Sequence, residues 1–121
     1  MSRLQLTKAQ RMAVYAKMHG HCAYCGTTLR PEDMQVDHVT PLARGGSDTF
    51  DNMFPACRSC NHYKHTLTVE RFRKALEQMP AVLLNNSATF RNAARFGLII
   101  QGAARVVFFF ERAESEEHPN G

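Results

Sequence analysis

The chain has 121 residues, of which 44% are hydrophobic and 21% charged, a composition typical of a small globular protein and not of a disordered segment. No apolar run is long enough to cross a bilayer, and the N-terminal residues are polar, so we expect a cytoplasmic protein without a membrane partner. Fifteen Lys and Arg residues against eleven Asp and Glu give a net charge of +4. The part before residue 111 is more basic still, which suits a polyanionic partner.

Turn residues and hydrophobic periodicity divide the first half into short elements. Thr7 is a candidate N-cap for the first helix, and Gly20 is its stop. Residues 40–52 combine proline, two glycines and small polar residues, which is typical of a loop. In chain order the predicted elements are a helix over residues 8–19, a tight turn over 21–29, a turn over 30–33, a strand over 34–39 with a neighbouring segment as its partner, a loop over 40–52 and a short helix over about 56–64.

The second half is predicted to be mainly helical. Thr68 caps one helix and Pro80 ends it. The expected elements are a helix over residues 69–78, a helix from the cap signal at residues 85–87 to about 96, and a C-terminal strand over the β-branched and aromatic residues 105–111. We expect a core over residues 1–80 and an extension over residues 81–121, which packs on the core and ends in an acidic tail.

The four cysteines form two CxxC pairs, and 31 residues separate the pairs. Two CxxC turns can aim four thiolates at one ion at about 2.3 Å, which completes a tetrahedral zinc site with no open coordination position. A cytoplasmic protein keeps its thiols reduced, which favours metal binding over disulfides, and a redox role for one CxxC leaves the other pair unexplained. The pattern predicts a structural zinc ion held by Cys22, Cys25, Cys57 and Cys60.

Three motifs in fixed order, CAYC, VDHVTPLARGGSDTFDN and CRSCNHYK, follow one another between residues 22 and 64. With these motifs the chain resembles the HNH nuclease family in its HNN form, over roughly residues 11–76. The resemblance implies an α+β fold, a small zinc-stabilised ββα-metal core, here with flanking helices and a C-terminal strand. It also implies a bacterial or phage-encoded endonuclease that hydrolyses phosphodiester bonds in DNA with one divalent cation.

The Asp-His pair of the central motif fits this chemistry. The carboxylate of Asp37 and the side-chain oxygen of Asn61 are hard ligands suited to Mg²⁺ or Mn²⁺. A cation held there stabilises the charge that develops on the phosphate and on the departing oxygen. His38 is expected to deprotonate the attacking water. Because adjacent strand residues point to opposite faces, the strand must end or twist at this pair if both side chains are to face one point.

Other residues of the motifs have candidate roles. By resemblance, Asn52 braces the loop through backbone hydrogen bonds and keeps His38 oriented. His65 lies one helical turn after Asn61 and is either a metal or phosphate contact or a cation at the helix C-terminus. Candidates for contact with DNA phosphates, which are alternatively solvated surface charges, are Arg44, Arg58 and Lys64.

Two classes of function are compatible with the sequence. A DNA endonuclease needs Asp37, His38 and Asn61 together. One metal site handles one strand, so a monomer is expected to nick, and duplex cleavage needs a homodimer or sequential nicks. A non-catalytic zinc-knuckle module that binds nucleic acid or protein needs only the cysteines and the basic charge. RNA cleavage shares the chemistry of the first class and differs in substrate.

Overall fold

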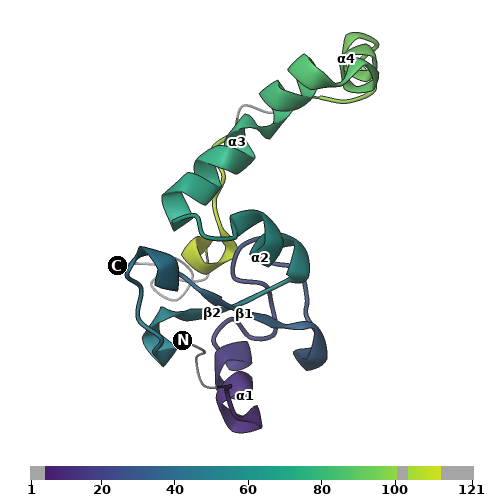
Figure 1. Ribbon diagram of the computed structural model, residues 1–121. Helices are drawn as coiled ribbons and strands as arrows, with labels where there is room; N and C mark the ends of the chain where they lie inside the picture. The colour runs from purple at the N-terminus through teal and green to yellow at the C-terminus, as the bar shows by residue number, and fades with distance from the viewer. Residues whose placement is uncertain (1–4, 101–103, 113–121) are drawn as a thin grey trace, which may run out of the picture. The chain divides into compact units, whose positions relative to one another are not determined.

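The computed structural model describes residues 5–100 and 104–112 and divides into two compact units. The first unit is formed by the residues up to Val69 together with those from Val107 onward, and the second by Glu70–Val106 (Figure 1). Among the described residues, no helix combines the length and the apolar character that a membrane span requires. The two units are built from different elements.

The first unit contains a ββα arrangement. Its two strands pair antiparallel, with Val36 opposite Pro55 and His38 opposite Met53. Helix α2 packs against β1, and helix α1 packs against β2 (Figure 1). The helices and strands are α1 (Lys8–Ala16), β1 (Gln35–His38), β2 (Met53–Ala56) and α2 (Arg58–Lys64), with short 3₁₀ turns at Pro31–Asp33, Leu42–Arg44 and Phe50–Asn52. The predicted mixed α and β fold class is confirmed, and the partner of the predicted strand is the segment just after the loop.

Helix α1 begins where the sequence predicts. The hydroxyl of Thr7 accepts a hydrogen bond from the Gln10 backbone N–H at 3.1 Å, and the Gln10 side chain accepts one from the Thr7 N–H at 2.8 Å, which is a capping box. The helix ends at Ala16, three residues earlier than predicted. Just beyond it, the ammonium of Lys17 donates to the Met53 carbonyl at 2.6 Å and so attaches the end of α1 to β2.

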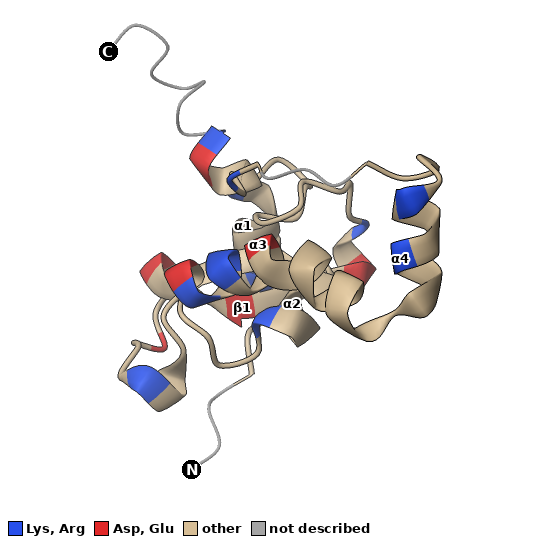
Figure 2. Ribbon diagram, turned by 90° about the horizontal axis from the view of Figure 1, so that it is seen from above, with Lys and Arg blue, Asp and Glu red and all other residues tan. Residues whose placement is uncertain are grey.

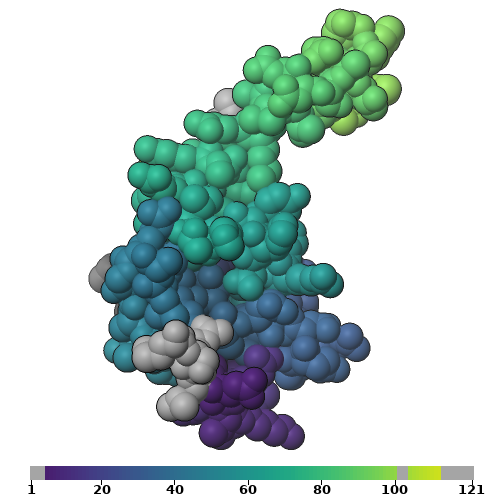
Figure 3. Space-filling view, in the orientation of Figure 1, coloured from purple at the N-terminus to yellow at the C-terminus, as the bar shows by residue number. Residues whose placement is uncertain are grey.

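The core of the first unit is small and aromatic. The ring of Tyr24 lies edge-on to Phe108, with ring centroids 5.3 Å apart, and both side chains are almost fully buried. Smaller apolar side chains complete the core: Val14, Leu29, Met34, Met53 and Ala56. In the space-filling view, the purple atoms of α1 adjoin the blue atoms of the following segment without a gap (Figure 3). The unit is therefore filled by a few large side chains drawn from distant parts of the sequence.

The C-terminal strand predicted over residues 105–111 is wrong. Residues 104–108 belong to no helix or strand, and a helical turn follows over 109–112. The Glu111 side chain accepts a hydrogen bond from the Phe108 N–H at 2.8 Å, which caps that turn. The Phe109 N–H donates to the Tyr24 carbonyl at 3.0 Å. The aromatic composition of this segment thus serves burial against the first CxxC turn and not pairing in a sheet.

The second unit consists mainly of helix α3 (Val69–Asn86, whose first residue belongs to the other unit) and helix α4 (Ala88–Arg95). The prediction that Pro80 ends the first of these helices is wrong, because α3 continues through it for six residues. An interior proline removes one backbone hydrogen bond, but the apolar helix formers that follow it tolerate this loss. The guanidinium of Arg91 donates to the carbonyls of Leu84 and Asn85 at 2.7 and 2.9 Å. These contacts occupy two carbonyl groups in the last turn of α3.

Helix α4 begins at the predicted cap. The Ser87 hydroxyl accepts a hydrogen bond from the Phe90 N–H at 3.1 Å. The helix ends at Arg95, next to the predicted stop, and Gly97 has a left-handed backbone with φ of 72°. Seen from above, α4 carries basic but no acidic residues (Figure 2).

Candidate active site and metal centre

The four cysteines lie together in the first unit. Their sulfur atoms are all within 4.8 Å of one another, and Sγ of Cys25 lies 3.8 Å from Sγ of Cys57. None of the four forms a disulfide. Four thiolates bound to one zinc ion at about 2.3 Å in a tetrahedron lie about 3.8 Å from one another. The observed spacing therefore fits the metal site that the two CxxC pairs predict.

The four thiols influence the protonation of one another. The Cys60 thiol donates a hydrogen bond to Cys22, which lowers the pKa of Cys22 to about 4 and raises the pKa of Cys60. Burial raises the pKa of the Cys25 thiol. Four thiolates at this spacing repel one another, so all four can be deprotonated together only around a bound cation. The donor set thus fits a structural metal ion with sulfur ligands.

The cysteine cluster also fixes the start of α2. Sγ of Cys57 accepts a hydrogen bond from the Cys60 N–H at 3.4 Å and is the N-cap of the helix. Asn61 follows in the next position, and its N–H donates to the Cys57 carbonyl at 3.0 Å. The cysteine cluster and the first turn of α2 therefore share their backbone, which places Asn61 beside the cluster.

Four of the polar residues singled out by the motifs line one pocket, and Asn52 is not among the residues that line it. Strand β1 ends at the Asp-His pair, as the alternation argument requires. The pocket has a volume of about 300 Å³, lies beside β1 and the end of α2, and is lined among others by Asp37, His38, Asn61 and His65. The structure therefore brings these four side chains together from two separate elements. Even His38 and Asn61 are 23 positions apart in the sequence.

Asp37 is buried and makes two polar contacts. Its Oδ2 accepts a hydrogen bond from the Tyr24 hydroxyl at 2.5 Å and lies 3.1 Å from the Lys64 ammonium. Burial and the neighbouring carboxylate both raise the pKa of Tyr24, which keeps its hydroxyl protonated as a donor. The Lys64 ammonium also donates to the His38 carbonyl at 3.1 Å.

The hypothesis that Lys64 contacts DNA is therefore wrong. Its side chain is fully buried, with an exposed fraction of 0%, and its ammonium pairs with Asp37. A buried ammonium needs such a partner because its transfer from water is costly. From the sequence alone, a lysine in the last turn of a short helix is expected to be exposed. The carboxylate that pairs with it in the interior, that of Asp37, lies 27 residues earlier in the sequence.

Asn52 holds the loop between the strands. Its side-chain oxygen accepts from the Thr40 N–H at 2.9 Å, and its amide nitrogen donates to the carbonyls of Thr40 and Ser47 at 2.9 and 2.8 Å. The close approach at Gly46, where a Cβ would lie 1.8 Å from the Thr40 oxygen, leaves no room for a side chain. Asn52 therefore makes hydrogen bonds to the loop backbone, as the family resemblance implies for this residue.

The imidazole of His38 is almost buried, with an exposed fraction of 8%, and its Nε2 lies 2.8 Å from Oδ1 of Asp48. Sequence reasoning missed Asp48. Nothing in its loop position distinguishes it from Asp51, and only the fold of the loop brings it to the imidazole.

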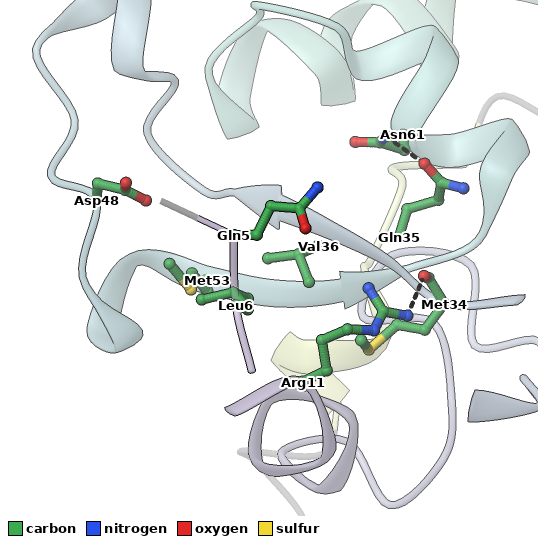
Figure 4. Close-up of a pocket in the computed structure, with 9 residues that line it drawn as sticks. All are labelled: Gln5, Leu6, Arg11, Met34, Gln35, Val36, Asp48, Met53 and Asn61. Carbon is green, nitrogen blue, oxygen red and sulfur yellow. Dashed lines mark hydrogen bonds between the residues drawn. The ribbon is translucent and has the colours of Figure 1, made fainter. Parts of the chain in front are cut away.

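A second pocket of about 590 Å³ adjoins the first, and the two share Val36 and Asn61. Figure 4 shows the Asn61 amide nitrogen directed at Gln35, whose Oε1 it meets at 3.4 Å, with the Asn61 carbonyl oxygen turned the other way. Asp48 and Arg11 lie at opposite parts of its wall (Figure 4). The Arg11 guanidinium donates to the Met34 carbonyl at 3.0 Å.

Of the remaining candidates, only His65 lines the first pocket. His65 is the C-cap of α2 with φ of 47°, and its side chain is exposed. Arg44 donates to the Thr66 carbonyl just beyond α2, which ties the loop to the helix end. Arg58 is exposed at the first position of α2. The structure therefore leaves Arg44 and Arg58 on the surface, whereas Lys64 is inside.

Residues 22–77 match the sequence model of the HNH endonuclease family. The chain is also similar to the CRISPR-associated endonucleases Cas9 of Corynebacterium diphtheriae and Actinomyces naeslundii, with 36% and 41% identity over 44 residues. Each of these similarities covers 36% of this chain and 4% of the relative. The chain therefore corresponds to a small part of each of these proteins.

The fold is similar to part of a solved structure, the crystal structure of the Type II-C Cas9 enzyme from Actinomyces naeslundii, with a TM-score of 0.54 and 24% sequence identity. This similarity covers 62% of this chain and 9% of that one, and at this identity it concerns the fold alone. The family match covers both CxxC pairs, β1, β2 and α2. The segment of residues 22–77 therefore belongs to the HNH endonuclease family.

Proposed function

We propose that the chain is an endonuclease that hydrolyses phosphodiester bonds in DNA with the help of a divalent cation. The observation that carries this proposal is the single pocket lined by Asp37, His38 and Asn61 within the segment that belongs to the HNH endonuclease family. The two similar proteins are named endonucleases, but the chain spans only 4% of their length, so its own activity is argued from the site.

The cysteine cluster supplies the frame. The spacing of the four sulfurs supports zinc as its ion, and a site with four thiolate ligands has no open position for a substrate. We therefore assign this zinc a structural role. It joins the turn before β1 to the start of α2 and so holds the two elements that carry the catalytic side chains.

Oxygen donors at the pocket fit a hard divalent cation such as Mg²⁺ or Mn²⁺. A carboxylate has about four lone-pair sites, so Asp37 retains acceptor capacity beside its contacts with Tyr24 and Lys64. The carbonyl oxygen of Asn61 is turned away from Gln35 (Figure 4). We propose Asp37 and Asn61 as ligands, with His65 as a further candidate at the same pocket. A cation bound there stabilises the charge that develops on the phosphate and on the departing oxygen.

The other residues of the pocket handle the proton and the geometry. His38 takes the proton of the attacking water as general base. Asn52 keeps the loop after β1 closed and thereby holds the end of the strand at which His38 stands. Lys64 fixes the same point from the other side, because its ammonium binds the His38 carbonyl and the Asp37 carboxylate at once. Arg44 and Arg58, which are exposed, are candidates for contact with the DNA backbone.

Conversion of supercoiled plasmid tests the proposal. With Mg²⁺ or Mn²⁺ the purified chain is expected to give nicked plasmid first, because one metal site handles one strand. EDTA is expected to stop the reaction. A linear product that rises steeply with protein concentration is expected if two copies combine for duplex cleavage.

Substitution of the base sharpens this test. His38→Ala is expected to lower the rate by about 10²–10⁴-fold, the range of general base catalysis. His62→Ala, which removes an exposed imidazole from α2, is the matched control and is expected to keep the rate. Plasmid binding without cleavage under either metal, or full activity of His38→Ala, contradicts the proposal and favours a non-catalytic binding module.

A further inference from the structure

We propose that Asp48 is the positioning residue of the catalytic imidazole. Its carboxylate engages Nε2 of His38 and thereby makes Nδ1 the nitrogen that takes the proton from water. This inference rests on the endonuclease function proposed above, and it assigns a role to a residue outside the Asp37, His38, Asn52 and Asn61 set.

The contact itself determines which nitrogen carries the hydrogen. Oδ1 of Asp48 lies 2.8 Å from Nε2 of His38, a normal hydrogen-bond length. An ionised carboxylate can only accept, so Nε2 must be the N–H donor of this bond. In a neutral imidazole the other nitrogen then carries the lone pair. A base that takes a proton from water must therefore use Nδ1.

Contacts that do not involve His38 fix the position of Asp48. The Asn52 amide nitrogen binds the carbonyl of Ser47, the residue just before Asp48, at 2.8 Å. The hydroxyls of Ser47 and Thr49, on either side of Asp48, lie 2.8 Å apart. The carboxylate is thus presented by a braced loop and does not depend on the imidazole for its place.

The nearby acids differ from Asp48 in their partners. Asp37 meets Tyr24 and Lys64. Asp51 interacts electrostatically with Lys17. Burial lowers the pKa of Lys17, and the negative charge of Asp51 partly opposes this shift. Asp48 lines the larger pocket, His38 lines the smaller one, and the two pockets share Val36 and Asn61. The pair therefore stands where the two pockets adjoin.

The ring nitrogens of His38 can be read directly by NMR of the ¹⁵N-labelled full chain with zinc bound. In the wild type we expect the spectrum of a ring with hydrogen on Nε2 and a lone pair on Nδ1. Asp48→Ala is expected to lose this single tautomer because the acceptor is gone. Asp51→Ala, which removes a carboxylate from the same loop, is the matched control and is expected to retain it. Asp48→Asn keeps a carbonyl oxygen that can accept the hydrogen bond, so the tautomer with hydrogen on Nε2 is expected to remain the main one.

Plasmid cleavage by the same variants tests whether the contact between Asp48 and His38 affects the rate of the reaction. Asp48→Ala is expected to lower kcat by about 10–100-fold without a rise in KM, as is usual when the partner that orients a functional imidazole is removed. Asp51→Ala is expected to keep the wild-type kcat. Equal kcat for the two alanine variants, a wild-type ring with hydrogen on Nδ1, or an unchanged tautomer in Asp48→Ala overturns the proposal. A wild-type protein with the expected tautomer that cleaves nothing contradicts the endonuclease function instead.

Discussion

The two compact units of the chain are stabilised by different means. In the unit with the candidate site, α1 and α2 have nine and seven residues and each strand has four, which is too short for stability in isolation. Contacts between distant residues hold this unit: four sulfurs, the buried Asp37–Lys64 pair and a few aromatic rings. In the other unit, an 18-residue helix supplies most of the backbone hydrogen bonds, and its Arg73 and Glu77 side chains bind the backbone of Val106. The candidate active site therefore lies where long-range contacts, and not local helix formation, determine the structure.

Loss of the zinc ion proposed for the cysteine cluster is expected to have the largest effect on the difference between the two units. Cys57→Ser removes one thiolate ligand but leaves a side chain that can still cap α2, and structural zinc contributes on the order of 10 kcal/mol to the folding of small domains. We expect the first unit to lose zinc and to unfold, while helical signal from α3 and α4 remains. Zinc content, circular dichroism and backbone NMR check this outcome.

Ser59→Ala, an exposed position between the two cysteines of the second pair, is the control for this substitution. It is expected to keep zinc, fold and activity. A Cys57→Ser protein that is folded and fully active would show that the metal cluster is not what holds the first unit together.

Removal of the buried cation is expected to have the next largest effect. Lys64→Met leaves the carboxylate of Asp37 without its charged partner, and breaking a fully buried pair in this way costs about 3–5 kcal/mol. The free energy of unfolding of the first unit, measured with denaturant, is expected to fall by this amount. The double variant Asp37→Asn with Lys64→Met is expected to recover part of the loss because no buried charge remains. Equal stability of the single variant and the wild type would mean that the pair does not hold the strand end.

Local sequence signals predicted the local features well. The Thr7 cap, the cap at Ser87 and the helix end near residue 96 depend on residues within four positions of each other, and the structure contains them. The two CxxC pairs predicted the sulfur cluster because two such turns leave few other arrangements for four thiolates.

Features that depend on distant partners could not be read from the sequence. Burial of Lys64 requires Asp37, which lies in another element, and the contact of Asp48 with His38 requires the loop that Asn52 closes. The same holds for the C-terminal segment. Its aromatic composition suggests a strand, but Phe108 packs on Tyr24 from the far end of the chain.

A change confined to the second unit is expected to have the smallest effect and to separate the two units. Ser87→Ala removes the hydroxyl that accepts from the Phe90 N–H, and the loss of such a cap costs about 1 kcal/mol. We expect amide hydrogen exchange in α4 to accelerate by roughly the fivefold that this free energy allows. Zinc binding and plasmid cleavage are expected to stay unchanged because the cysteine cluster and the pocket belong to the other unit.

Two further variants bracket this expectation. Ser87→Asp keeps an acceptor at the N-cap and is expected to restore slow exchange, whereas Thr89→Ala, inside the first turn of α4, leaves the cap in place. A fall in the cleavage rate of Ser87→Ala that Ser87→Asp restores would show that the order of α4 matters to the reaction. The second unit would then take part in the proposed reaction, and the division of the chain into a unit with the candidate site and a separately stabilised helical unit would have to be abandoned.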